Sequence, residues 1–261
     1  MAGEAYHAQV IVLRKTKLGE SDLILTLLGQ DGSQLRAVAK GARKPANTFA
    51  SRLELYSMAE VLCAKGRSLD IVKEARLVDP HRKLRIALEY SAGAAPMAEL
   101  LDKATQDGLA NQKLFAMTAA ALSCLEEVDV GQIPSITAAH LLKAFAFLGL
   151  RPSLGSCAVC AAPLVCNEHV SQVPFSYREG GALCPQCSAL VVTPVLSSAV
   201  MTWLSFLLGT PFAEIKEKAI MPEVSFEALR FCQAWAREHL GLNMRSLAFM
   251  LGCGLYGSGS G

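Results

Sequence analysis

The first part of the chain has the hydrophobic pattern of short β-strands. Val10 and Val12 share one face of an extended segment, because side chains in a strand alternate with a period of two. Ile11 and Leu13 share the other face. Runs of this kind are broken by turn residues at short intervals, which predicts strands over residues 7–17, 20–29, 33–40, 53–63 and 68–77.

Two turns in this region are marked by glycine. Asp31-Gly32 lies between two apolar runs and is a strong hairpin signal, and Gly66-Arg67 marks a second turn. Five short strands match the oligonucleotide/oligosaccharide-binding barrel, the OB-fold, in number and segment length. An SH3-like barrel has a similar strand count, so the pattern alone leaves both open. We expect a barrel domain over residues 1–80.

After residue 80 the spacing of apolar residues becomes helical. Leucines and other apolar residues recur so that one face of each segment is apolar, and Gly149 with Pro152 ends a helix over residues 136–149. More helices are expected near 194–209, 211–219, 224–240 and 243–251. The expected fold class is α+β, with a helical domain over 81–152 and 193–251, a module inserted at 153–192, and a flexible tail at 252–261.

Four cysteines in the inserted module form two Cys-x-x-Cys pairs. Cys157 and Cys160 make the first pair, and Cys184 and Cys187 make the second. Two thiolates from each pair complete a closed tetrahedral shell, which is the pattern of a structural zinc site without an open position for catalysis. We therefore predict one structural Zn²⁺ ion.

The remaining cysteines fit other roles. The N-terminus lacks the charged and apolar regions of a secretory signal, so we expect a cytoplasmic protein with reduced thiols rather than disulfides. Cys166 or His169 could replace one zinc ligand, although an exposed loop position is the simpler interpretation. Apolar surroundings predict core positions for the other cysteines, Cys63, Cys124, Cys232 and Cys253.

Catalytic and membrane classes are disfavoured by the sequence. A nucleobase deaminase requires His-x-Glu before its cysteines, and a zinc protease requires His-Glu-x-x-His; neither motif occurs. The most apolar stretch, residues 195–208, is interrupted by serines and threonine and is too short to cross a bilayer comfortably. We therefore predict a protein that is neither an enzyme nor inserted in a membrane.

Positive charge is concentrated at the front of the chain. Residues 1–85 contain fifteen Lys and Arg against nine Asp and Glu, a net charge of +6. The remainder contains ten against fourteen, a net charge of −4, which gives the total of +2. A polyanion should therefore be attracted to the barrel region.

One basic segment, residues 40–45 (KGARKP), is suited to binding phosphate groups. Gly41 permits a tight exit from a strand, and three cations then project from one flexible loop. Arg43 can form a forked pair of hydrogen bonds with phosphate, while Lys44 acts as a point charge. The alternative is an ordinary solvated loop. The DNA-binding residues that we predict are Arg14, Lys15, Lys40, Arg43, Lys44, Arg52, Lys65 and Arg67.

Contacts of this kind position a nucleic-acid backbone but do not read its sequence, so binding should be nonspecific. Phe49 or Tyr56 could stack on unpaired bases. Either side chain could equally belong to the core.

The stretch at residues 18–45, LGESDLILTLLGQDGSQLRAVAKGARKP, resembles the N-terminal block of the bacterial recombination-mediator family RecO. The resemblance continues through Phe49, Arg52, Leu53 and Glu54, through the four-cysteine module, and into residues 240–247, LGLNMRSL. It spans most of the chain, although the middle helices match only in general character. Some members of the family lack the zinc cysteines.

This resemblance implies that residues 1–80 form an OB-fold nucleic-acid-binding domain. It implies binding of single- and double-stranded DNA and annealing of complementary strands. It also implies partners: the mediator RecR, the acidic C-terminal peptide of the single-strand-binding protein SSB, and, indirectly, the recombinase RecA, which would be loaded on SSB-coated DNA. The residues that contact these partners, the oligomeric state and the strand preference are not implied. Two other classes remain as alternatives: a zinc-ribbon RNA-binding accessory protein of transcription or translation, and a zinc hydrolase.

Overall fold

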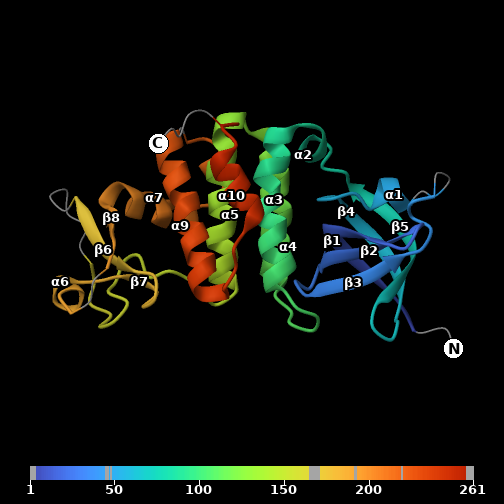
Figure 1. Cartoon of the computed structure of the whole chain (residues 1–261), viewed down its shortest axis with the longest axis horizontal. Helices are drawn as coiled ribbons and strands as arrows, with labels where there is room; N and C mark the ends of the chain where they lie inside the picture. Colours follow the sequence, from blue (N-terminus) through green and yellow to red (C-terminus); the bar gives the residue numbers. More distant parts are fainter. Residues whose placement is uncertain are drawn as a thin grey trace. The chain divides into compact units, whose positions relative to one another are not determined.

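The computed structural model describes residues 4–44, 47, 49–164, 171–190, 193–218 and 220–256 of the chain. It divides into two compact units, unit 1 at Met1–Glu127 and unit 2 at Val128–Gly261 (Figure 1). The division falls inside the stretch expected to form the first half of the helical domain. The helices before it belong to the barrel unit.

Unit 1 begins with a closed five-stranded barrel. Its strands are β1 (Ala5–Leu18), β2 (Asp22–Gly29), β3 (Gln34–Ala39), β4 (Met58–Ala64) and β5 (Asp70–Asp79). The order around the barrel is β1-β2-β3-β5-β4, in which β3 and β5 are parallel and the other pairs are antiparallel. This order, with the short helix α1 (Phe49–Arg52) between β3 and β4, is that of the OB-fold, and the predicted α+β class is confirmed.

Two details of the barrel differ from the sequence pattern. The fourth strand begins at Met58 rather than at residue 53, because the chain turns after α1 and Ser57 donates its hydroxyl to the Glu54 carbonyl at 2.7 Å. The first strand has an irregular register between Val12 and Arg14, and its residues from Val10 to Leu13 are all buried. Val10 and Val12 belong to the barrel core, so alternation along β1 would expose Ile11 and Leu13. Both are nevertheless buried, and helix α3 packs against this strand.

Both glycine turns that the sequence marked are present. Gly32 lies between β2 and β3 with a φ of +83°, and a Cβ there would stand 1.9 Å from the Asn111 carbonyl oxygen. Gly66 lies between β4 and β5, where a Cβ would stand 1.9 Å from the Leu69 carbonyl oxygen. At both positions, close backbone approach requires the absence of a side chain.

Three helices complete unit 1: α2 (Lys83–Ile86), α3 (Leu88–Ala104) and α4 (Gln112–Glu127). The link from α3 to α4 contacts the barrel through hydrogen bonds. Gln34 donates its backbone N–H to the Gln106 carbonyl at 3.0 Å and its side-chain amide to the Asp102 carbonyl at 3.0 Å. The β2–β3 turn and this link therefore hold barrel and helices together.

Unit 2 is a helical bundle with a small sheet beside it. Helix α5 (Ile133–Phe147) is its centre and packs against α7 (Ser198–Gly209), α8 (Phe212–Ile215) and α9 (Pro222–Leu240), while α10 (Arg245–Gly252) packs on α9. A 3-10 turn at Val130–Gln132 precedes α5. Most of α5 is buried, whereas the sequence pattern indicated a single apolar face for each helix. Among the described helices, none is both long enough and apolar enough to span a membrane.

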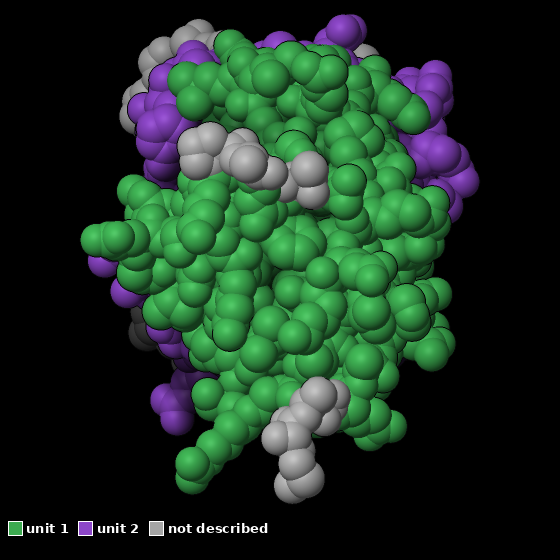
Figure 2. Space-filling model, turned by 90° about the vertical axis from the view of Figure 1, so that its right-hand side faces the viewer, with its two compact units in different colours: residues 1–127 green, residues 128–261 purple. Residues whose placement is uncertain are grey.

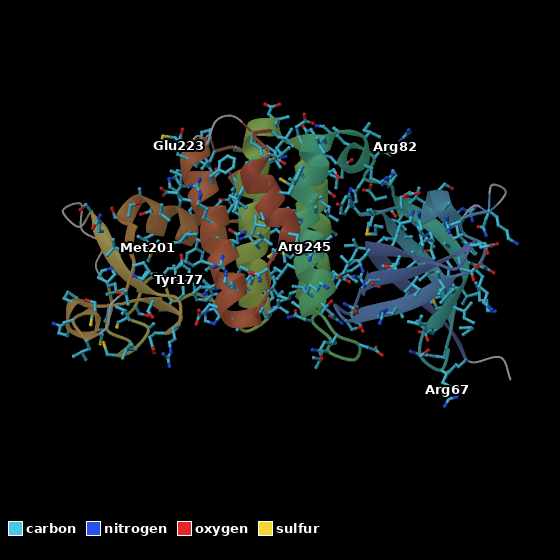
Figure 3. All side chains as sticks on the ribbon, viewed as in Figure 1. Arg67, Arg82, Tyr177, Met201, Glu223 and Arg245 are labelled. Carbon is cyan, nitrogen blue, oxygen red and sulfur yellow. The ribbon has the colours of Figure 1, made fainter. Side chains whose placement is uncertain are left out.

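The four-cysteine module lies between α5 and α7. It contains β6 (Gln172–Ser176), β7 (Gly181–Ala182), the short helix α6 (Pro185–Ser188) and β8 (Val195–Ser197). Phe175 and Tyr177 pack their rings against Phe231 and Trp235 of α9, with centroid distances of 5.2–6.3 Å within this group. Tyr177 is labelled in Figure 3. The module is thus anchored on the bundle by an aromatic cluster.

The expected tail at 252–261 begins with ordered residues. Tyr256 is buried, with its ring 6.5 Å from that of Phe226 in α9. The last residues, GSGSG, lie outside the described part of the chain.

We expect Gly32→Ala to destabilise the protein much more than Gly19→Ala. Both glycines have positive φ, so alanine costs about 1 kcal/mol at either position. Only Gly32 also lies against backbone atoms, whereas a Cβ at Gly19 meets nothing within 4 Å. Thermal unfolding of the two variants measures the difference, and equal losses of Tm would contradict the packing of this turn.

Candidate nucleic-acid interface and metal centre

The basic segment Lys40–Lys44 follows β3 and lies beside the turn between β1 and β2. The Gly41 N–H donates to Oδ1 of Asp22 at 2.7 Å, and the Arg43 N–H donates to the Ser21 carbonyl at 2.8 Å. Ala42, in the middle of the segment, is 1% exposed and belongs to the barrel core. The segment was expected to be a flexible loop. Instead, these contacts fix its backbone to the barrel.

Arg43 does not project freely as the sequence suggested. One nitrogen of its guanidinium donates to the carbonyls of Gly19 and Glu20 at 3.1 and 2.9 Å. The guanidinium therefore ties the segment to the β1–β2 turn, although the side chain remains exposed. Lys40 and Lys44 are also exposed, and neither side chain forms a hydrogen bond or ion pair with another of the described residues.

Asp22 is the polar residue of this site that the sequence did not single out. Its Oδ1 accepts the Gly41 N–H and, at 3.0 Å, the Ser21 hydroxyl. The bond from Gly41 lowers the pKa of Asp22, and the Ser21 hydroxyl and the positive charges of Lys40 and Lys44 add to that effect. The only advance signal was its position in the block that resembles RecO.

Several predicted DNA-binding cations already have partners inside unit 1. Lys15 lies 2.7 Å from the carboxylate of Glu54. Arg14 lies 3.4 Å from the carboxylate of Asp102 in α3. Arg52, at the end of α1, donates to the Ala75 carbonyl at 3.0 Å. These three side chains hold elements of the unit together, and part of their charge is offset.

The last two predicted cations, Lys65 and Arg67, lie in the β4–β5 turn. Lys65 is 3.5 Å from the Asp70 carboxylate, and its ammonium group lies 4.8 Å from the centre of the Tyr6 ring. Arg67 is exposed at the tip of this turn, which Figure 3 shows at the far end of the barrel from α1. The structure therefore does not gather all eight predicted residues.

Figure 2 shows the surface of unit 1 from the barrel side.

The two candidate stacking residues are both engaged in packing. Tyr56 is 6% exposed, and Phe49 is partly buried against the barrel core. The core alternative that the sequence left open therefore describes both residues better.

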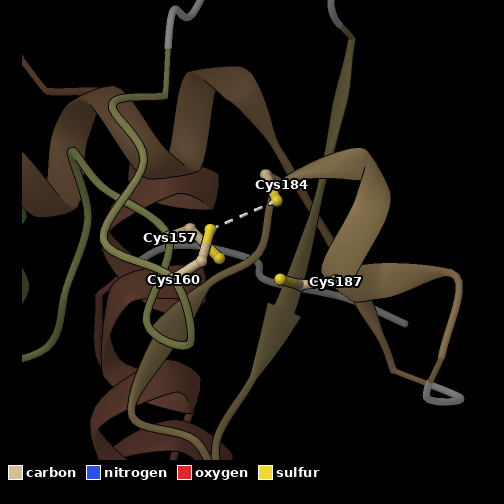
Figure 4. A group of neighbouring side chains, drawn as sticks. All are labelled: Cys157, Cys160, Cys184 and Cys187. Atoms are coloured by element: carbon tan, nitrogen blue, oxygen red, sulfur yellow. Dashed lines mark hydrogen bonds between the residues drawn. The ribbon is translucent and has the colours of Figure 1, made fainter.

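The predicted metal ligands come together. The sulfur atoms of Cys157, Cys160, Cys184 and Cys187 all lie within 4.8 Å of one another, and those of Cys160 and Cys184 are 3.7 Å apart (Figure 4). A tetrahedral ion with metal–sulfur bonds of about 2.3 Å would place its ligands about 3.8 Å apart. The cluster therefore fits one metal ion held by four sulfurs.

Local backbone bonds shape the two cysteine loops. In the first, the Cys157 N–H donates to the Ala162 carbonyl at 2.8 Å and the Ala161 N–H returns to the Cys157 carbonyl at 2.9 Å. The second begins with Cys184 as the N-cap of α6. Cys157 and Cys184 are buried, Cys187 is half-buried, and Cys160 is exposed.

Electrostatics also favour a cation at this cluster. The backbone N–H of Cys160, followed by that of Cys184, lowers the pKa of Cys157 to about 6. A hydrogen bond with Cys184, burial and the other thiols raise the pKa of Cys187 to about 12. Four thiols at this spacing cannot all ionise alone, because each thiolate opposes the next. A bound divalent cation removes that conflict.

The other cysteines are mostly core residues, as predicted. Cys63, Cys124 and Cys232 are buried, whereas Cys253 is half-buried. Burial raises the pKa of the Cys63 thiol to about 11, and it raises the pKa of Cys232 further still. Both thiols are therefore protonated and unreactive at neutral pH. Cys166 and His169, the alternative ligands, lie outside the described residues.

Asp79, His81 and Glu126 form a second group of potential ligands, which the sequence pattern gave no reason to expect. Nδ1 of the buried His81 ring lies 3.1 Å from Glu126 and 3.4 Å from Asp79. The other Glu126 oxygen accepts the Lys83 N–H at 2.8 Å. Direct hydrogen bonds thus account for the group, which joins the start of α2 to the end of α4.

Comparison with known proteins agrees with these features. The family model described as "Recombination protein O N terminal" matches residues 1–81, and the model described as "Recombination protein O C terminal" matches residues 86–248. The two matches meet near the junction between β5 and α2.

Similar proteins over most of the chain bear the name "DNA repair protein RecO". The one from Roseiflexus sp. (strain RS-1) is 33% identical over 256 residues, covering 96% of this chain and 86% of its own length. The one from Pelotomaculum thermopropionicum is 30% identical over 257 residues, covering 98% and 97%. The one from Desulfitobacterium hafniense (strain Y51) is 36% identical over 200 residues, covering 77% and 69%. The chain therefore belongs to the RecO family of DNA repair proteins, which are non-enzymatic recombination mediators.

Proposed function

We propose that this protein binds single- and double-stranded DNA through its barrel, anneals complementary strands, and with RecR helps to load RecA on SSB-coated single strands. The family supports DNA repair and recombination in general. The specific contribution of this chain is drawn from the basic segment Lys40–Lys44 and its surroundings.

The observation that carries the proposal is the pair of exposed ammonium groups on a fixed backbone. Lys40 and Lys44 flank Ala42, which is buried in the barrel core, so their main-chain positions are set before any ligand arrives. Fixed cations bind a phosphate backbone with less loss of conformational entropy than cations on a mobile loop. Lys17, exposed near the end of β1, adds a third positive charge in the strand that leads into the neighbouring turn.

Annealing follows from charge neutralisation. Two DNA strands repel each other through their phosphates, and a cationic surface reduces that repulsion by displacing bound counterions. Arg67 lies at the other end of the barrel from α1 (Figure 3). Separated basic positions suit contact with more than one stretch of backbone. None of these contacts requires recognition of base edges, so binding is expected to be nonspecific.

We propose that the four-cysteine cluster holds one structural Zn²⁺ ion. The ligands are all sulfur, and four of them close a tetrahedral shell, which leaves no position for a reacting water. This argues against a zinc hydrolase. The role of the ion is to hold the two cysteine loops together beside the aromatic cluster on α9.

The proposed partners are RecR, the C-terminal peptide of SSB and, indirectly, RecA. Their support is family membership. We do not assign residues to these contacts. A mediator of this kind acts on chromosomal DNA, so the proposed location is the cytoplasm, at the nucleoid.

Replacing both Lys40 and Lys44 with Ala should weaken binding to a single-stranded oligonucleotide about tenfold at fixed low salt, because two phosphate contacts are lost. The slope of log affinity against log salt should also become shallower by about 1.4, at about 0.7 for each contact. Fluorescence anisotropy over a salt series measures both quantities.

The matched control is Lys218→Ala with Arg230→Ala, which removes two exposed cations from unit 2. It should change affinity less than about twofold. Equal losses in the two double variants would mean that overall charge, rather than the basic segment, determines binding. Circular dichroism checks that both proteins are folded.

The unmodified protein should bind single-stranded DNA at least as well as RNA of the same sequence, and it should accelerate annealing of complementary DNA with or without SSB. The reason is that contacts to the phosphate backbone do not require the 2′-hydroxyl. Competition titration and a strand-annealing assay test these two expectations. A clear preference for RNA would favour the zinc-ribbon RNA-binding alternative.

Removal of the metal should loosen the cysteine module. In a Trp203→Phe background, Trp235 is the single tryptophan, and its indole N–H donates to the Leu150 carbonyl at 3.0 Å next to Phe175 of the module. Chelation should lower Tm by about 5 °C or more and shift Trp235 emission to longer wavelength. Metal analysis should find one Zn²⁺ per chain before chelation.

Cys160→Ala should reproduce the chelated state, since Cys160 is exposed and its own packing contributes little. Cys253→Ala, outside the cluster, should retain the ion. Full zinc content in Cys160→Ala would contradict the four-sulfur site.

A further inference from the structure

A negatively charged residue lies in the middle of the proposed DNA-binding site. Asp22 begins β2, and its carboxylate is close enough to Lys40 and Lys44 for their charges to lower its pKa. On charge alone, a carboxylate at this position should repel a phosphate backbone and compete with it for the two lysines. Its geometry indicates a different role.

Asp22 is bonded to the backbone of the basic segment rather than to a lysine side chain. Oδ1 of Asp22 accepts the Gly41 N–H at 2.7 Å, and no ion pair joins Asp22 to a cation among the described residues. Gly41 has a φ of +65°, a conformation in which the chain reverses sharply after β3. The bond therefore holds the turn at the point where Lys40 leaves the strand.

Further bonds attach the same segment to the same turn. The Arg43 N–H reaches the Ser21 carbonyl, and the Arg43 guanidinium reaches the carbonyls of Gly19 and Glu20. Lys40 and Lys44 stand on either side of these attachments. Their side chains stay exposed, whereas the groups that carry them are fixed.

We propose that Asp22 is a positioning residue of the DNA site: its Oδ1 holds Gly41 so that Lys40 and Lys44 present their charges to the phosphate backbone. This inference rests on the proposed function. Arg43 acts in the same way through its bonds to the β1–β2 turn, and the direct phosphate contacts come from the two lysines. The benefit of a fixed segment outweighs the repulsion from one carboxylate.

Removing the Asp22 carboxylate distinguishes repulsion of DNA from positioning of the segment, because the two roles predict opposite changes in DNA affinity. If Asp22 acts only through its charge, Asp22→Ala should tighten DNA binding. If it positions the segment, Asp22→Ala should weaken binding, by about tenfold for loss of a hydrogen bond to a charged acceptor. The probe is a fluorescent single-stranded oligonucleotide at fixed low salt.

Asp22→Asn is the conservative variant. Both hydrogen bonds to Asp22, from Gly41 and from Ser21, end on the same oxygen, so an asparagine carbonyl can accept them both. The variant loses the negative charge but keeps the attachment, and it should bind DNA at least as tightly as the unmodified protein. Glu74→Ala is the matched control, because it removes an exposed carboxylate from β5 of the same barrel. Its affinity should change less than about twofold.

Weak binding by Asp22→Ala with restoration by Asp22→Asn supports the proposal. Unchanged or tighter binding by Asp22→Ala overturns it, and so does equally weak binding by both variants. If the unmodified protein does not bind the oligonucleotide, the proposed function fails instead, which keeps the two conclusions separate.

Amide hydrogen exchange gives a test that does not depend on the folding of a variant. In the unmodified protein, the Gly41 N–H should exchange much more slowly than an unbonded amide, because Asp22 holds it. Rapid exchange at Gly41 would overturn the proposal even if Asp22→Ala cannot be obtained in folded form.

Discussion

The hydrogen bonds between the β1–β2 turn and the segment after β3 are the contacts on which the proposed DNA binding by the barrel depends. Without them, Lys40 and Lys44 would be two cations on an ordinary solvated loop. Asp22 and Arg43 convert that loop into a surface with a defined main chain. The segment that carries Lys40 and Lys44 is therefore held in place by hydrogen-bond acceptors: the Asp22 carboxylate and the carbonyls of the β1–β2 turn.

The four-cysteine module also depends on a few specific bonds, in this case those between its sulfurs and the proposed metal ion. Cys157 and Cys184 are buried in a very small apolar cluster that could not hold the two loops by itself. Four sulfurs around the proposed Zn²⁺ ion would supply what this small core lacks. The rings of Phe175 and Tyr177 then join the module to α9, so that metal binding and packing of the bundle are linked.

Sequence patterns predicted those features that depend on local chemistry. The glycine at residue 32 and the spacing of the cysteines each specify a geometry: the turn is present, and the four sulfurs lie together. Features that depend on distant partners were not predictable. Arg43 was expected to project toward phosphate, but its partners are carbonyls more than twenty positions earlier in the chain. Lys15 and Arg14 likewise meet acidic residues that no sequence spacing connects to them.

The unequal exposure of the four cysteines has a consequence for exchange of the ion with the surroundings. Cys160 is open to solvent, whereas Cys157 and Cys184 are enclosed. Competing ligands and oxidants would therefore reach the Cys160 sulfur of the proposed zinc site first, and the half-buried Cys187 after it. The two buried sulfurs, Cys157 and Cys184, would release a bound ion last. Loss and uptake of the metal should therefore both begin at Cys160.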